Sequence, residues 1–205
     1  MRREADVIIA LSAILLSWQS HSQEVSPAVL ERSKEAPTGW FGGAGAGFAH
    51  VRWKTTPKVH ANGLSFDLKG GYLHGFRSGL VLGGEVCCCF FPDLAHAMGN
   101  NGQIELGKVS ASISGLLGTF LPQIKGILGT AFGFSSVNTK IERTENGKKR
   151  EEKFSNFQPE IGLFYMTNIW KTVYIRVDGR CAVGLTSSQI ETNRFMIMLS
   201  MFYLF

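Results

Sequence analysis

The last eleven residues of the chain, Phe195 to Phe205, carry an apolar side chain at every second position. Counted back from the end, this stripe consists of Phe205, Tyr203, Met201, Leu199, Ile197 and Phe195. Successive side chains of a β-strand point to opposite faces, so the stripe predicts a strand with one continuous apolar face. A tilted strand of about 11 residues can cross the hydrocarbon core of a membrane. The stripe fits such a strand, and it also fits the last core strand of a soluble domain.

Turn-forming residues divide the chain after residue 38 into eight extended segments. The predicted strands cover residues 40–53, 63–73, 78–90, 103–116, 125–139, 153–167, 172–184 and 193–205. They are longer than the usual strand of a globular protein. The connections between them alternate between short turns and longer polar loops. Outer-membrane barrels have this order, with short turns on the periplasmic side and longer loops outside. The sequence therefore predicts an all-β fold, an eight-stranded antiparallel up-and-down barrel.

Each predicted strand has one apolar and one polar face. In residues 63–73, for example, Leu64 and Leu68 share one face, whereas Asp67 and Lys69 share the other. A soluble barrel turns its apolar face inward, and a transmembrane barrel turns it outward to lipid. Periodicity alone does not distinguish these two arrangements.

The beginning of the chain favours the transmembrane arrangement. Arg2 and Arg3 precede an apolar run from Val7 to Leu16, and small and polar residues follow it. This layout predicts a secretory signal peptide over residues 1–22. Residues 23–38 then form a periplasmic tail, and residues 39–205 form the barrel domain. No other segment is apolar enough for a membrane helix, but an exported chain can span a bilayer as a closed barrel.

Charged residues at inward positions predict a polar network in the lumen. An eight-stranded barrel barely holds its own side chains, and a lone buried charge costs several kcal/mol, so these acids and bases should pair and close the lumen. An ion pathway is the alternative interpretation. The predicted network consists of Asp67, Lys69, Glu85, Glu105, Glu160, Arg176, Asp178 and Arg180.

Little in the sequence points to catalysis, cofactors or metals. The net charge of +5 is spread along the chain, which argues against nucleic-acid binding. The glycine-rich run from Gly42 to Gly47 lacks the last glycine of a dinucleotide loop and instead favours close contact at a barrel seam. His50, His60 and His96 have no serine at a related spacing, and no His or Cys set predicts a metal site.

The four cysteines are Cys87, Cys88, Cys89 and Cys181. Alternation sends Cys88 to the face opposite its two neighbours, so packing is the favoured interpretation of all four. A disulfide between Cys88 and Cys181 has no support in the sequence.

Three features of the chain are similar to those of a known protein family. They are the apolar N-terminal run, the glycine-rich first strand and the final Tyr203-Leu204-Phe205. The chain resembles small eight-stranded outer-membrane β-barrel proteins of Gram-negative bacteria, such as the OmpA and OmpX barrels or similar domains in Bacteroidetes. The resemblance implies a monomer among outer-membrane lipids and insertion by the barrel-assembly machinery. That machinery would read Tyr203 and Phe205 as its signal. The resemblance implies little about activity.

Residues 139–154 form a charged segment that predicts an ordered surface hairpin with Asn146-Gly147 in its turn. A two-residue turn sets Glu142 against Glu151, and like charges directly opposite each other are destabilising. A four-residue loop sets Glu142 against Lys149 and Lys140 against Glu151, with Gly147 closing the loop. The sequence therefore predicts the four-residue loop.

Taken together, these features predict an integral outer-membrane barrel with a structural or surface-binding role, a possible surface protein partner and no catalysis. Two alternatives stay open. One is a soluble exported barrel that binds an apolar ligand, and the other is a lipid-modifying barrel enzyme. The sequence identifies no specific ligand or partner.

Overall fold

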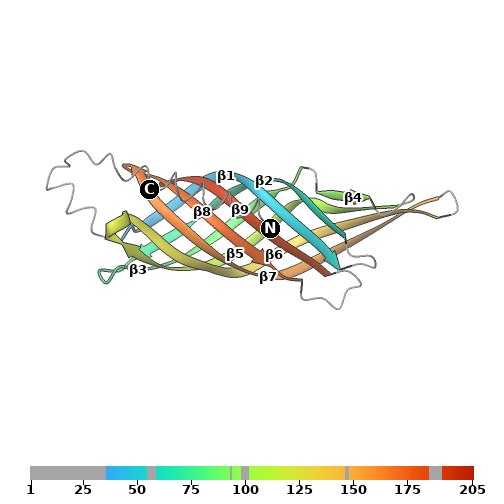
Figure 1. Ribbon diagram of the computed structural model, residues 1–205. Coiled ribbons are helices and arrows are strands. Elements are labelled where there is room, and N and C mark those ends of the chain that lie inside the picture. Colours follow the sequence, from blue (N-terminus) through green and yellow to red (C-terminus); the bar gives the residue numbers. More distant parts are fainter. Residues whose placement is uncertain (1–35, 55–58, 93, 98–101, 146–147, 185–190) are drawn as a thin grey trace, which may run out of the picture. The chain divides into compact units, whose positions relative to one another are not determined.

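The computed structural model describes residues 36–54, 59–92, 94–97, 102–145, 148–184 and 191–205 (Figure 1). All of them belong to the compact unit Glu35–Phe205. The predicted signal peptide and most of the predicted tail lie outside the described residues. The strands are β1 (Gly39–Lys54), β2 (Val59–Gly75), β3 (Leu80–Phe90), β4 (Ala95–Ala97), β5 (Gly102–Leu121), β6 (Gly126–Glu145), β7 (Lys148–Trp170), β8 (Val173–Ala182) and β9 (Glu191–Leu204).

The strands close into one antiparallel barrel. Each strand pairs with its neighbour along the chain, and β1 also pairs with β9 through fourteen positions from Phe41↔Leu204 to Lys54↔Glu191. Both β3 and the short β4 pair with β5, so these two strands share one position in the wall. The wall therefore has eight positions, and the predicted eight-stranded up-and-down barrel is confirmed. Among the described residues, no helix is long and apolar enough to cross a membrane.

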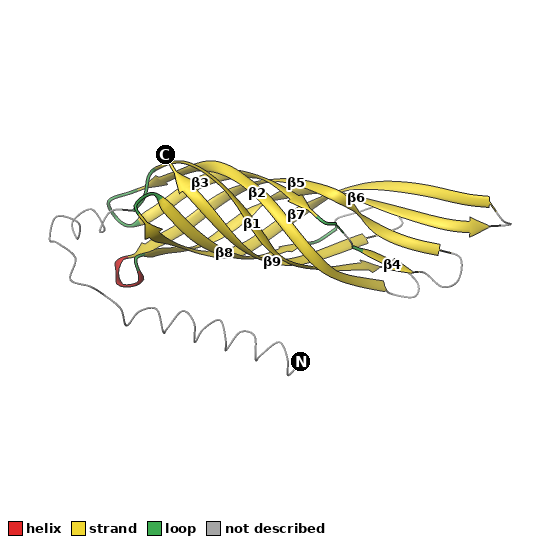
Figure 2. Ribbon diagram, turned by 90° about the horizontal axis from the view of Figure 1, so that it is seen from above, coloured by secondary structure: helices red, strands yellow, loops and turns green. Residues whose placement is uncertain are grey.

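Several strands extend further than their sequence patterns predict. The predicted connection over residues 117–124 is strand as far as Leu121, because the ladder to β6 continues to the pair Leu121↔Gly126. The 3-10 helix η3 (Pro122–Ile124) then makes the turn, and Lys125 takes a left-handed conformation with φ of 47°. At the other end, β6 runs six residues beyond the predicted 139, and β7 begins five residues before the predicted 153. This extension makes β6 and β7 the longest hairpin of the barrel, and it projects past the other strands (Figures 1 and 2).

The barrel turns its apolar face outward, as the transmembrane interpretation predicts. On β2, Leu64 and Leu68 are exposed, whereas Asp67 and Lys69 are buried. The stripe on β9 also faces outward, and Leu199 is 58% exposed. This arrangement is the inverse of a soluble domain, where apolar side chains fill the interior.

The interior contains more apolar side chains than the sequence predicts. Trp53, Phe91 and Ile104 belong to one buried apolar cluster, and Phe41 and Phe164 belong to a second one. Along β2 and β3, the charged residues lie between these two clusters. On β3, for example, Glu85 follows Val81 of the second cluster and precedes Cys87 of the first. The lumen therefore has a polar middle layer with an apolar layer on each side.

Glycines allow β1 to approach β9 closely at the point where the barrel closes. A methyl group on Gly43 or Gly47 would overlap the backbone carbonyl oxygen of Met201 or Ile197, respectively. At Gly42, which alternates to the outer face, the nearest atom to such a methyl group is Cε2 of Phe205, at 3.9 Å. The interpretation of the glycine run as a seam is thus consistent with the observed contacts.

This difference predicts opposite outcomes for two alanine substitutions. We expect Gly47→Ala to lower the free energy of unfolding by about 1–3 kcal/mol, because the backbone of β9 must move away. Gly42→Ala should be neutral or slightly stabilising, because its methyl group enters open space. Urea titration of the refolded barrel measures both effects. Equal effects at the two positions would contradict the seam contact.

Candidate functional site

Two arginines of β8 form the centre of the lumen network. Arg176 donates through Nη1 to Oε2 of Glu85 at 2.7 Å and through Nη2 to Oδ1 of Asp178 at 2.5 Å. Arg180 donates to Glu160 at 3.0 Å and to Asp178 at 3.2 Å, and it also pairs with Glu85. Because β8 alternates regularly, Arg176, Asp178 and Arg180 all point inward. One carboxylate, Glu85 from β3, therefore links both guanidinium groups across the lumen.

The network extends from this centre in two directions. Lys69 Nζ lies 2.7 Å from Oδ2 of Asp67 and 2.9 Å from Oδ2 of Asp178. On the other side, Arg194 Nη2 lies 3.2 Å from Oε2 of Glu160. Arg194 also donates to the hydroxyl groups of two serines, Ser110 at 2.9 Å and Ser135 at 3.0 Å. The structure thus brings seven of the eight predicted network residues together and adds Arg194.

Arg194 was not predicted from the sequence, although a signal was present. The outward stripe begins at Phe195, so alternation alone places its neighbour on the inward face. Glu105, the eighth predicted residue, finds no support among its neighbours. Its side chain lies outside what the structure describes, and Ile104 and Leu106 beside it are both buried. The buried residues of β5 have even numbers on both sides of the register shift between Leu106 and Ser110, so alternation argues against Glu105 as a lumen residue.

The network is balanced in charge and enclosed by aromatic rings. Four carboxylates and four cations take part, so their formal charges cancel. The guanidinium carbon of Arg176 lies 4.4 Å from the ring centroid of Phe164, and that of Arg194 lies 5.4 Å from Phe91. Apolar clusters lie on both sides of the charged residues along β2 and β3, whereas Arg194, Thr139 and Thr192 bring polar groups into the first cluster. This arrangement suits packing and closure of the lumen better than an ion pathway.

The residues of the predicted assembly signal lie together on the outer wall. Tyr203 and Phe205 are exposed, and their ring centroids are 5.1 Å apart. The backbone N–H of Phe205 donates to the carbonyl oxygen of Trp40 at 2.8 Å, which continues the β1–β9 contact to the end of the chain. These rings are accessible from outside the barrel. Their reading by an assembly machinery stays a prediction.

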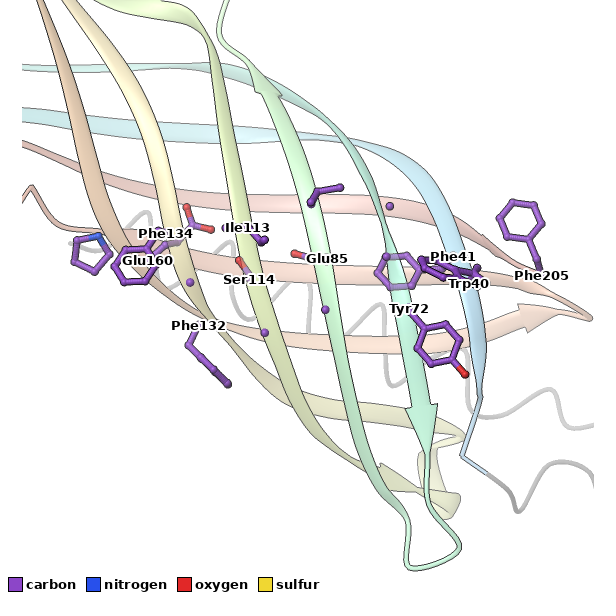
Figure 3. A pocket seen from close by; sticks show the side chains of 17 residues that line it. Trp40, Phe41, Tyr72, Glu85, Ile113, Ser114, Phe132, Phe134, Glu160 and Phe205 are labelled. Atoms are coloured by element: carbon purple, nitrogen blue, oxygen red, sulfur yellow. The ribbon is translucent and has the colours of Figure 1, made fainter.

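A shallow apolar groove of about 1150 Å³ crosses the outer wall over β1, β2, β3, β5 and β6 (Figure 3). Its floor is backbone at Gly70, Gly84 and Gly115, which alternate to the outer face. Trp40 and Tyr72 stand at one end near Phe205, whereas Phe132 and Phe134 stand at the other (Figure 3). The groove offers shape and apolar contact but no outward nucleophile or charge. It is part of the apolar exterior and shows no catalytic arrangement.

The cysteines lie on both sides of the wall. Cys87 and Cys89 are buried, with their Sγ atoms 3.4 Å apart, whereas Cys88 and Cys181 are exposed. All four are free thiols. The predicted alternation of the three consecutive cysteines is therefore confirmed.

The β6–β7 hairpin has the two-residue register, so the predicted four-residue loop is wrong. Glu142 pairs with Glu151, and the ladder continues to Glu145↔Lys148. Gly147 lies outside the described residues, as does the side chain of Lys149. The like charges are tolerated because cations on the same face neutralise them. Lys140 Nζ lies 2.6 Å from Oε1 of Glu142 and 3.3 Å from Oε2 of Glu151.

A fourth residue completes this arrangement. Lys153 Nζ lies 3.0 Å from Oε1 of Glu151, so the four residues form a chain of three ion pairs in the order Glu142, Lys140, Glu151, Lys153. Hydrogen bonds from Lys153 and Lys140 lower the pKa of Glu151, and bonds to Glu142 and Glu151 raise the pKa of Lys140. A lowered carboxyl pKa means that the pairing persists above the ordinary Glu value and is lost only in more acidic solution. The hairpin therefore keeps its ion pairs at neutral pH.

Comparison with known proteins identifies the fold. No protein-family model matches this chain, and no curated protein matches it. Among solved structures, Ail, the attachment invasion locus protein of Yersinia pestis, was crystallised with the heparin analogue sucrose octasulfate. It shares 13% identity, with a TM-score of 0.50, over 80% of this chain and 99% of Ail. Neisserial surface protein A shares 12% identity, with a TM-score of 0.50, over 83% of this chain and all of that protein.

More distant similarities include an enzyme. The outer-membrane protease OmpT of Escherichia coli has 8% identity and a TM-score of 0.45, over 89% of this chain and 99% of OmpT. At these identities the similarity concerns the fold alone. It agrees with the apolar exterior and the paired charges of the interior. The chain has the fold of the small eight-stranded outer-membrane β-barrels.

Proposed function

We propose that this outer-membrane barrel binds another protein at the cell surface through the β6–β7 hairpin and has no catalytic role. The observation that carries the proposal is an open strand edge on the part of the molecule that projects furthest. The last pair between β7 and β8 is Glu160↔Ala182, whereas β7 itself begins at Lys148. Among the described residues, positions 148–159 of β7 therefore have a strand partner on the β6 side only.

The open edge presents backbone hydrogen-bonding groups in a known direction. The carbonyl oxygen of Pro159 faces the β8 side, where it accepts from the N–H of Val183 at 3.1 Å. In an antiparallel ladder, every second residue directs its N–H and C=O to the same side. Ser155 and Phe157 therefore direct these groups to the open side. An extended segment of a partner protein can add to such an edge as a further strand.

Side chains along the hairpin supply a means of selecting the partner. Both signs of charge are present in the chain of ion pairs from Glu142 to Lys153 and in the pair Arg150–Glu152, at 3.3 Å. Nearer the barrel, Phe134 and Phe157 stack outside with ring centroids 5.2 Å apart. Complementary charges favour one partner over others, and the backbone ladder provides affinity.

Vesicles that carry the protein test this function on surfaces coated with extracellular matrix proteins. We expect Ser155→Pro to reduce binding by about tenfold or more, because proline removes one donor of the open edge. Ser155→Ala is the matched control and should bind as the parent does. Replacement of residues 141–151 by a short turn should also abolish binding.

Gel mobility before and after heating shows whether each variant is folded. If folded Ser155→Pro and the shortened hairpin both bind like the parent, the hairpin is not a binding element. If soluble heparin competes with binding and Ser155→Pro has no effect, charge alone carries the attachment and strand addition is wrong.

A further inference from the structure

Two histidines on neighbouring strands lie close together on the outer face, near the ends of β1 and β2 that lead into residues 55–58. His50 pairs with Asn62 across the ladder, and Arg52 pairs with His60, so the two histidines are diagonal neighbours. Both side chains are exposed, and their ring centroids are 5.9 Å apart with an angle of 36° between the ring planes. Diagonal positions of an antiparallel pair are within reach of long side chains.

Asn62 fixes the orientation of one imidazole. Nδ1 of His50 lies 2.5 Å from Oδ1 of Asn62. An amide oxygen only accepts hydrogen bonds, so Nδ1 is the donor in this contact, and in the neutral imidazole Nε2 then has the available lone pair. Metal-binding histidines usually donate their second ring nitrogen in this manner, which sets the tautomer and holds the ring in place. His50 is therefore prepared to act as a ligand through Nε2.

We propose that His50 and His60 form a surface site for a divalent transition metal ion. Imidazole nitrogens bind such ions at about 2.0–2.1 Å, which places the centroids of two ligating rings about 4.5 Å apart at a right angle and about 5.2 Å apart at a tetrahedral angle. The observed separation of 5.9 Å is within about 1 Å of the tetrahedral value, so a small rotation of the two exposed side chains brings both nitrogens to one ion. Water completes the coordination, since no group of three or more His, Cys, Asp or Glu residues gathers among the described side chains. Imidazole ligands select Zn²⁺, Cu²⁺ and Ni²⁺ over Mg²⁺ and Ca²⁺.

The positive charge of Arg52 lowers the affinity of the site for a metal ion. It also provides a test that distinguishes cation binding from anion binding. Arg52 lies opposite His60 on the same face, and its guanidinium repels a divalent cation. If the cluster instead bound an anion such as phosphate, Arg52 would be its strongest ligand. Removal of the Arg52 charge therefore has opposite effects in the two cases. The sequence pattern does not indicate this site, because the two histidines are ten positions apart and meet only through the strand register.

Titration of the refolded full-length chain with Ni²⁺ tests the site. Ni²⁺ is the chosen probe because, unlike Cu²⁺, it is not reduced by the exposed thiols of Cys88 and Cys181. We expect His50→Ala and His60→Ala each to weaken Ni²⁺ binding by more than about tenfold, and Asn62→Ala by about tenfold. Arg52→Gln should strengthen binding. His74→Ala is the matched control, because His74 is exposed at the opposite end of β2 and packs on Phe76.

Three results would overturn the proposal. The first is Ni²⁺ affinity that is unchanged in both histidine variants, and the second is weaker binding in Arg52→Gln. The third is an equal loss of Ni²⁺ affinity in His74→Ala, which would mean that Ni²⁺ binds histidines without a defined site. Because all four positions are exposed, heat-dependent gel mobility should show every variant folded.

Discussion

Replacement of Arg180 by alanine is expected to lower the free energy of unfolding by about 3–5 kcal/mol. Arg180 is 2% exposed and contacts Glu85, Asp178 and Glu160, so its loss leaves three buried carboxylates short of one cation. Breaking a buried ion pair costs this much because the remaining charge stays desolvated without a partner. Urea unfolding of the barrel in detergent micelles measures the change.

Two further variants separate this electrostatic effect from general damage. Arg150→Ala removes a side chain that is 68% exposed, and it should change stability by no more than about 0.5 kcal/mol. The double variant Arg180→Ala with Glu160→Gln makes the network neutral again and should recover part of the loss. A loss below about 1 kcal/mol for Arg180→Ala alone would show that water reaches the network and screens its charges.

The second large effect concerns the outer face of β9. We expect Leu199→Lys to destabilise the barrel by about 2–4 kcal/mol, the cost of lysine on the lipid face near the middle of the bilayer. Leu199 pairs with Val177 and Ala46, four residues from Tyr203 at the end of the stripe. Leu199→Ala should cost less, because lipid fills the space that the smaller side chain leaves. Refolding into lipid vesicles at several urea concentrations measures both variants.

An alanine substitution on the inner face of β9 gives a useful contrast. Ser200 accepts from Nζ of Lys69 at 3.3 Å, and it points into the lumen. Ser200→Ala should therefore be mild, since Lys69 keeps its two carboxylate partners. Equal tolerance of lysine and alanine at position 199 would mean that this face is not in contact with hydrocarbon.

Local alternation predicted the faces of most strands correctly. Leu64 and Leu68 lie outside and Asp67 and Lys69 inside, as the period of two requires. For Glu105 the same alternation argued against the prediction, because the buried residues of β5 are even-numbered from Ile104 through Ser110 to Leu116. The same alternation places Arg194 on the inward face, because its neighbour Phe195 faces outward. Its three partners, however, come from β5, β6 and β7, which no local pattern relates.

The hairpin shows why pairwise rules are not sufficient. Directly opposed Glu142 and Glu151 argue against the observed register when they are considered alone. Lys140 and Lys153 lie on the same face and neutralise both carboxylates, so the observed register has no net penalty from this pair. The proposed metal site depends on register in the same way, since it places His50 beside His60.

The sequence by itself determined the class of fold, the number of wall positions and the faces of regular strands. These properties follow from a period of two and from turn residues, which act over a few residues of chain. The tertiary structure decided the closure of β1 on β9, the apolar layers above and below the charges, the open edge of β7 and the hairpin register. Each of these depends on which distant strands become neighbours, because burial and ion pairing are properties of the assembled barrel and not of any one segment.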